Sequence, residues 1–275
     1  MNRKAWMWVL LAPMIGGCAA SSDGPSLGNI GRGFADDFAG ARGYDRATLA
    51  LSRGDLARVQ EVGRALDKRI TGGSHGALSV ASTWMQARSN EAMSLDMSAS
   101  QTPDGFDRDQ TRRESNRLYR AALAFMPTDV RARRQLDPVT LNSLGYFLAE
   151  RGQNRAQLQQ AADLTALAVE LSPATNSAER YSRALGPQDS HAWALFKLGQ
   201  TSKALETQIA VLSTASEESA KYGPPPAEVV YHLGAILRVA GHEEQARAAF
   251  RVALGLAPSV ELEELLRSDL EGQLT

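Results

Sequence analysis

The sequence lacks several features that mark particular classes of protein. Its 275 residues contain a single cysteine, so no disulfide can form within the chain. The formal net charge of −1 argues against a nucleic-acid-binding protein, which needs a basic surface. No apolar run reaches the roughly 20 residues that span a bilayer. The four histidines do not have the spacing of zinc ligands, and we expect neither a metal nor a cofactor.

A pattern of two helices stands out in residues 227–258, within an ordinary composition of 43% hydrophobic and 22% charged residues. Apolar residues recur at helical spacing on both sides of Gly241, which breaks the pattern, and a proline ends it. Small residues at three positions predict a close approach of the two helices. The positions that carry the pattern are Val230, Leu233, Gly234, Leu237, Gly241, Ala246, Phe250, Ala253 and Pro258.

These positions resemble the tetratricopeptide repeat (TPR), a helical hairpin of about 34 residues. Residues 141–173 resemble it too, with about four extra residues in the expected turn near 154–157. Residues 189–212 also resemble it, but His191 replaces the usual leucine and Gln208 the usual aromatic residue. A buried, hydrogen-bonded His191 is the ordinary explanation, and a ligand is the alternative. We expect repeats at about 138–175, 185–218 and 227–260.

The resemblance implies an all-α fold, in which helical hairpins of the TPR type stack into a right-handed superhelical solenoid. The TPR domain is expected at residues 137–275, ending in an acidic C-terminal capping helix. Residues 44–136 have a TPR-like rhythm without the signature residues, so a helical region of degenerate repeats is expected there. Within it, residues 111–126 predict a helix and residues 98–110 a loop. The apolar stripe of the capping helix is Leu262, Leu265, Leu266 and Leu270.

The chain opens with MNRKAWMWVLLAPMIGGC, in which two basic residues precede a short apolar run and two glycines. This opening resembles the signal peptide and lipobox of bacterial lipoproteins. The resemblance implies removal of residues 1–17 and acylation of Cys18, and Ala19 favours the periplasmic face of a Gram-negative outer membrane. Residues 18–43, rich in glycine, serine and aspartate, are expected to form a flexible tether. The alternative is an ordinary secretory signal with an incidental cysteine.

Two patterns in the N-terminal half could carry chemistry. Residues 72–76 match the G-x-S-x-G string of a nucleophile elbow, which needs a strand before the serine. A helix is predicted there instead and no Asp or His partner stands out for Ser74, so we interpret the string as a loop between helices. Trp84, Met85, Met93 and Met97 recur at helical spacing, which favours core packing over a soft copper site. We predict that the protein is not an enzyme.

The most basic region lies between residues 108 and 134. One interpretation is a solvated helix face, whose charge is balanced by Asp107, Asp109, Glu114 and Asp129. The other is a surface for an anionic partner, such as a headgroup or an acidic protein. The arginines concerned are Arg108, Arg112, Arg113, Arg117, Arg120, Arg131, Arg133 and Arg134.

TPR arrays bind partners on the concave face, which the resemblance assigns to set positions in the first helix of each repeat. Aromatic residues among polar ones are typical of recognition surfaces. Packing against the next repeat is the alternative for Tyr146 and Trp193. The carboxylate clamp of some TPR domains is missing, so a helix or extended segment is the expected ligand. The predicted partner-binding groove consists of Asn142, Tyr146, Glu150, Asp189, Trp193, Phe196, Lys197, Tyr231 and Arg238.

The sequence therefore predicts a periplasmic TPR scaffold, lipid-anchored to the outer membrane, that mediates protein–protein interactions in envelope assembly. Secretion, pilus biogenesis, polysaccharide export and cell-wall regulation all fit. The expected partners are envelope proteins at the concave face and the membrane at the lipid anchor, with no nucleic acid. Two alternatives stay open. One is a periplasmic enzyme whose N-terminal half is active through Ser74 or His75 and whose repeats recruit substrate. The other is a soluble exported binding protein, which lipid on Cys18 would rule out.

Overall fold

The computed structural model describes residues 41–103 and 105–271, and every regular element in them is a helix. The expected all-α class is therefore confirmed for this part of the chain. Cys18, the signal segment 1–17 and most of the predicted tether lie outside the described residues. Residues 41–43 were assigned to the tether by composition, but they are helical. They continue into a helix whose Ala47 and Leu51 are buried in the core.

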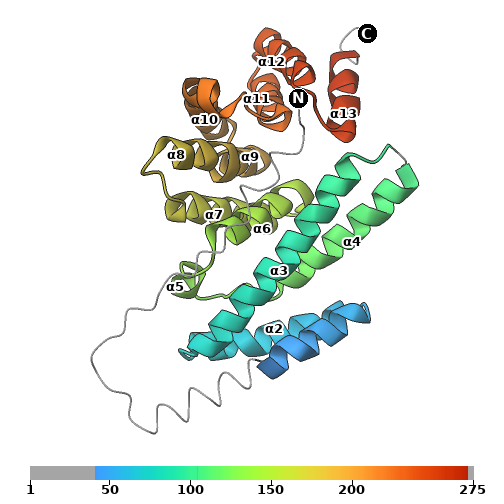
Figure 1. Cartoon of the computed structure of the whole chain (residues 1–275), viewed down its shortest axis with the longest axis vertical. Coiled ribbons are helices and arrows are strands. Elements are labelled where there is room, and N and C mark those ends of the chain that lie inside the picture. Colours follow the sequence, from blue (N-terminus) through green and yellow to red (C-terminus); the bar gives the residue numbers. More distant parts are fainter. Residues whose placement is uncertain (1–40, 104, 272–275) are drawn as a thin grey trace.

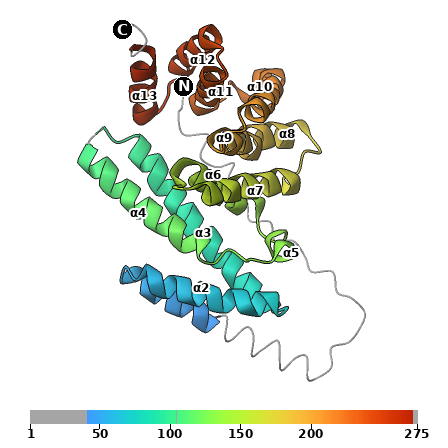
Figure 2. The same cartoon turned by 180° about the vertical axis from the view of Figure 1, so that it is seen from behind.

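A long hairpin of two helices dominates the N-terminal half and runs obliquely to its neighbours (Figures 1 and 2). The helix that precedes the hairpin packs near one end of it, and the other end of the hairpin reaches the C-terminal helix. The elements of this half are a helix over residues 41–52, α2 (Leu56–Thr71), α3 (His75–Ser100), α4 (Gly105–Leu123) and the short α5 (Val130–Arg133).

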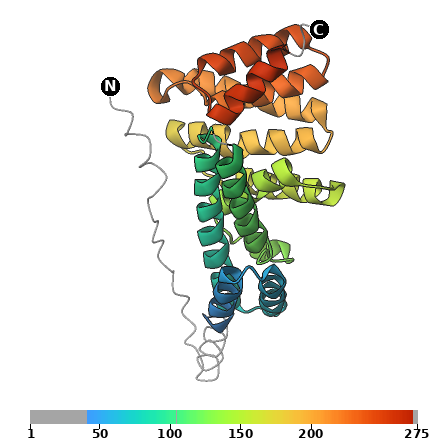
Figure 3. The ribbon, with the colours of Figure 1, turned by 90° about the vertical axis from the view of Figure 1, so that its right-hand side faces the viewer.

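The C-terminal half is a stack of paired helices, which Figure 3 shows in layers. Each pair contains two contacting helices joined by a short turn, and the first helix of the middle pair is extended by α8 and a π-helical segment that contains Pro187. The elements are α6 (Pro138–Arg151), α7 (Arg155–Leu171), α8 (Ser177–Arg183), η2 (Ala184–Gln188), α9 (Asp189–Lys197), α10 (Thr201–Tyr222), α11 (Ala227–Val239), α12 (Glu243–Gly255) and α13 (Val260–Glu271).

Four turns between helices have the same geometry, with a glycine at positive φ. At Gly241, where φ is 84°, the glycine N–H bonds to the Arg238 carbonyl at 3.1 Å and the next N–H to the Leu237 carbonyl at 2.9 Å. These bonds satisfy carbonyls that the helix end leaves free, and a side chain would strain the backbone. Two of the turns lie in the N-terminal half, where the repeat signature is weak. The four glycines are Gly54, Gly73, Gly199 and Gly241.

Other glycines let helices approach closely. A Cβ on Gly234 of α11 would overlap the ring of Phe250 in α12, and one on Gly145 of α6 would lie 2.6 Å from Cγ2 of Thr165 in α7. The predicted close approach of paired helices is thus confirmed for these two pairs. Gly63 of α2 plays the same part in the N-terminal half, where a Cβ would overlap the backbone carbonyl of Ala124.

The expected enlarged turn at residues 154–157 is wrong. The Asn154 side chain caps α7 by accepting a hydrogen bond from the Gln157 N–H at 3.0 Å, so the helix starts directly after it. The helix has 17 residues where the equivalent α12 has 13. The additional four residues are about one helical turn. A further turn satisfies its own backbone hydrogen bonds, which a longer loop would not do.

The expected loop over residues 98–110 is also wrong, because α3 continues to Ser100 and α4 begins at Gly105. Hydroxyl groups in this polar segment bond to carbonyls of the preceding helical turn: Ser100 Oγ to Met97 at 2.9 Å and Thr111 Oγ1 to Asp107 at 2.9 Å. Such bonds allow Ser and Thr on an exposed helix face. Turn-forming composition is therefore a poor guide in this hairpin.

The N-terminal core combines a few large apolar side chains with many buried alanines. Trp84 of α3 stacks on Phe125 with ring centroids 4.3 Å apart, and both are buried together with Met85, as predicted for Trp84 and Met85. Met97, in contrast, is 63% exposed, so its expected core role is wrong. It lies in the last turn of α3, near the turn that joins α3 to α4.

Candidate functional site

The structure brings the predicted groove residues together along α6, α9 and α11, the first helices of the three pairs. Helix α9 packs against both of the others. Exposure divides the residues into two groups, because Asp189 and Trp193 are buried whereas the others are accessible to different degrees. The half-buried members are Asn142, Tyr146, Phe196, Tyr231 and Arg238, and the exposed members are Glu150 and Lys197.

Trp193 lies at the centre of this group and joins all three helices. Its ring stacks on His232 of α11 with centroids 4.2 Å apart, and its indole N–H donates to the Glu150 carboxylate of α6. The Lys197 ammonium lies 5.0 Å from the ring centroid, within the range of a cation–π contact. Only 4% of Trp193 is exposed. Its packing between helices, which the sequence left as the alternative, is what the structure shows.

Asp189 is also buried and accepts hydrogen bonds from two residues of other helices. Gln208 Nε2 of α10 donates to its Oδ1 at 2.7 Å, and His232 Nδ1 of α11 lies 3.0 Å from its Oδ2. Gln208 Nε2 also donates to the Val229 carbonyl at 2.9 Å. The unusual Gln208 thus replaces an apolar contact by a polar link between the second and third pairs. His232 was not among the predicted site residues.

Charge explains how His232 is tolerated in the interior. Burial by itself lowers the pKa of His232, but the carboxylate of Asp189 outweighs it, and the net result is a pKa above the usual 6.5. Glu228 and Glu150 act in the same direction at longer range. The interior of the array is therefore acidic around one histidine, and a proton is retained there more tightly than in water.

The accessible part of the group is an acidic and aromatic rim. The Tyr146 hydroxyl donates to Glu228 Oε1 at 2.6 Å, linking α6 to the start of α11. Burial and the Glu228 carboxylate raise the pKa of Tyr146 well above its usual range. Burial and Asp269 raise the pKa of Tyr231 to about 12. Both phenols are thus neutral hydrogen-bonding groups at physiological pH, and neither is a candidate base.

Most of the arginine-rich region is engaged within the molecule. Arg112 of α4 bonds to Asp96 of α3 at 2.8 Å, and Arg108 and Arg112 also reach acidic residues of α13. Arg117 pairs with Glu114 and Arg134 with Glu170. Internal ion pairs therefore account for much of this charge, and several of the acidic partners come from distant parts of the sequence.

The remaining candidates have structural roles. Ser74 is the N-cap of α3 and accepts a hydrogen bond from the Ala77 N–H at 3.2 Å, and the residue stretch before it is α2 rather than a strand. The interpretation as an inter-helix loop is confirmed for residues 72–74, whereas His75 and Gly76 begin α3. His191 is half-buried, and its Nδ1 lies 3.1 Å from Thr165 Oγ1. Burial lowers its pKa.

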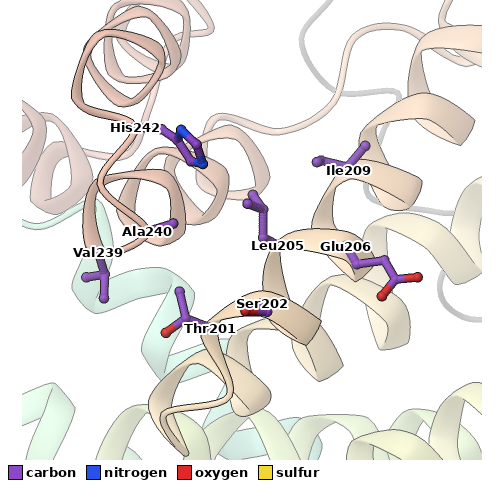
Figure 4. Close-up of a pocket in the computed structure, with 8 residues that line it drawn as sticks. All are labelled: Thr201, Ser202, Leu205, Glu206, Ile209, Val239, Ala240 and His242. Carbon is purple, nitrogen blue, oxygen red and sulfur yellow. The ribbon is translucent and has the colours of Figure 1, made fainter.

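A shallow cavity of about 590 Å³ lies on another side of the array, between α10 and the turn from α11 to α12 (Figure 4). Its wall combines hydroxyl groups with Ile209 and Val239, both more than half exposed. His242 and Glu206 are its titratable residues, and both are exposed. The lining residues are Thr201, Ser202, Leu205, Glu206, Ile209, Val239, Ala240 and His242.

The described residues hold no cluster of three or more His, Cys, Asp or Glu side chains suited to a metal ion. Across 41–103 and 105–271, none of the helices combines the length and apolar character of a membrane span. No family model matches the chain, and no curated protein is significantly similar to it.

Proposed function

We propose that residues 138–271 form a TPR-type array that serves as a protein-binding scaffold. The observation that carries this proposal is the alignment of α6, α9 and α11, whose aromatic and charged residues form one continuous group. Repeated glycine turns and close glycine seams support the repeat assignment. The signature positions in the sequence are the reason for proposing that the repeats are of the TPR type.

The accessible rim is the part of this group that a partner can contact. Glu150 and Lys197 are exposed beside buried Trp193, and Tyr146 and Tyr231 present partly covered rings. Charged groups around aromatic ones are suited to a protein segment that combines apolar anchors with polar ends. We propose an envelope protein as the partner and attachment to the outer membrane through lipid on Cys18, which the lipobox-like opening supports.

The test is an in-cell crosslink and pull-down with the lipidated full chain. Because Trp193 is buried, its removal would test folding as much as binding. The exchange Glu150→Lys/Lys197→Glu reverses the rim charges and leaves the net charge unchanged. Because both side chains contact Trp193, the variant must also keep the circular dichroism spectrum and melting temperature of the wild type. We expect it to abolish capture of an envelope protein that the wild type retains.

The matched control is Lys203→Glu/Glu206→Lys, an equivalent exchange between two exposed residues of α10. Capture by the control should equal that by the wild type. If the rim exchange captures the same protein to the same extent, this surface is not the binding site. Labelled palmitate should appear on the wild type and be lost in Cys18→Ser; a chain that carries no label would contradict the anchor.

A further inference from the structure

Helix α13 lies between two parts of the molecule that are far apart in sequence. Figures 1 and 2 show it beside the upper end of the α3–α4 hairpin and next to α12. Glu261 and Glu264, near its start, pair with Arg112 and Arg108 of α4, the latter at 2.8 Å. Asp269, near its end, accepts from Arg238 of α11 at 2.8 Å. The acidic helix is therefore held by basic residues of both halves.

Its apolar side is small. Leu266 is fully buried in a cluster with Phe250 and Val230, and Leu262 and Leu270 are only partly buried beside them. Leu265, which the sequence placed in the same stripe, is 43% exposed. The attachment of α13 therefore combines a few buried leucines with ion pairs, and ion pairs at partly exposed sites weaken with salt.

The basic side of the contact belongs to the body of the protein. The Arg112 side chain is 18% exposed, against 43% for its partner Glu261, and it is also held by Asp96 at 2.8 Å. Its Nε is buried without a hydrogen-bond partner in the structure. The guanidinium is thus oriented by α3 and α4, and its remaining N–H groups can donate to an acidic group on another helix.

The place that α13 occupies adjoins the predicted groove. Arg238 is one of the groove residues, and Tyr231, another, packs against the same apolar cluster as Leu266 and lies close enough to Asp269 for its pKa to rise. The chain's own acidic helix therefore lies where a ligand of α11 and α4 would lie.

We propose that α13 is an internal ligand: it occupies a docking site for an acidic amphipathic helix, and a partner helix of the same chemistry displaces it. The site consists of Arg108 and Arg112 at one end, Arg238 at the other and the apolar cluster around Phe250 between them. This inference rests on the proposed scaffold function and names the class of partner that the array takes. The partner needs acidic residues at the spacing of Glu261, Glu264 and Asp269, with leucines on the adjacent face.

The experiment measures binding of a fluorescent peptide of residues 259–271 to the full chain by anisotropy. In Glu261→Arg/Glu264→Arg, the internal helix meets Arg108 and Arg112 with like charges and is released. We expect this variant to bind the peptide at least tenfold more tightly than the wild type does. In Arg108→Glu/Arg112→Glu, the site itself is reversed, and binding should be lost. A peptide with both glutamates changed to arginine should bind that variant instead.

The control Arg113→Glu/Arg120→Glu makes the same charge change at two exposed residues of α4 and should bind like the wild type. Circular dichroism and melting temperature show that each variant is folded. Equal peptide affinity in all variants, or no peptide binding to Glu261→Arg/Glu264→Arg, would overturn the proposal and make α13 a fixed cap. Concentration-dependent dimers of Glu261→Arg/Glu264→Arg would also overturn it and assign the site to a second copy of the chain.

A second measurement uses the unmodified chain. Hydrogen exchange of the α13 amides should accelerate as salt rises from 0.05 M to about 0.5 M, because the Debye length falls severalfold, whereas exchange in α11 should not. Unchanged exchange in α13 would contradict displacement. Neither assay uses the lipid anchor or an envelope partner, so their failure and a failed pull-down are distinguishable.

Discussion

The two halves of the molecule use the same turns and glycine seams but different interiors. The interior of the N-terminal half is mainly apolar, with many alanines around the stack of Trp84 on Phe125. The C-terminal half has the polar link of Asp189, Gln208 and His232 between its second and third pairs. An apolar interior depends on shape alone, whereas a buried polar link also fixes which groups must face each other. The proposed partner-binding surface lies in the C-terminal half, where the buried polar link fixes which helices face each other.

The largest expected effect breaks the polar link. Asp189→Ala leaves His232 buried without its partner and removes one of the two acceptors of the Gln208 amide, and losing one member of a buried pair costs about 3–5 kcal/mol. Denaturant unfolding of the variant measures this loss. Asp189→Ala/His232→Leu should recover part of it, because the unpaired histidine is removed as well. A loss below about 1 kcal/mol for Asp189→Ala would show that the link is not structural.

The next effect compares the glycine seams. A methyl group at Gly63 meets the backbone carbonyl of Ala124, whereas one at Gly234 meets the ring of Phe250, which can move. We expect Gly63→Ala to cost about 3 kcal/mol and Gly234→Ala about 1–2 kcal/mol. Gly255→Ala has open space around it and should change stability by about 1 kcal/mol or less. The reverse order of the two seam variants in urea unfolding would contradict the packing described for them.

The smallest effect is on pH dependence. The raised pKa of His232 stabilises the fold below about pH 6.5, and this contribution is lost as the pH rises through the folded-state pKa. His191, whose pKa is lowered, acts oppositely: stability falls as the pH drops below its unfolded value. We therefore expect the melting temperature of His191→Leu to decrease from pH 6 to pH 8. Adding His232→Gln should remove that slope, and a slope that persists would have to come from other groups.

Helical spacing predicted most of the elements correctly, because apolar periodicity and capping residues are local properties. Asp55 and Asp129 cap helices, and Leu118 and Phe125, in and just after the helix that begins at Gly105, are buried. Three errors, at 41–43, 98–110 and 154–157, arose where small or polar residues suggested a tether or a loop. In all three places the chain satisfies its backbone by continuing a helix, and composition alone does not reveal this.

The TPR resemblance selected first-helix residues, and α6, α9 and α11 bring them together as one group. Their role in partner binding stays a prediction. The resemblance did not separate buried Trp193 from exposed Lys197, because burial depends on which helix packs over each residue. His232 was missed because a lone histidine in a helix has no local signal. Its partner Asp189 is 43 positions away in the sequence.

The sequence by itself determined most of the helices and the glycine turns, since each depends on residues within one or two helical turns of one another. Only the tertiary structure decided that Asp189 meets His232 and that α13 returns to α4, where Arg108 and Glu264 are 156 positions apart. The chain has nearly equal numbers of basic and acidic residues, and the sequence does not specify which of them pair. Packing of the helices brings particular pairs within hydrogen-bonding distance, and that choice is a property of the whole fold.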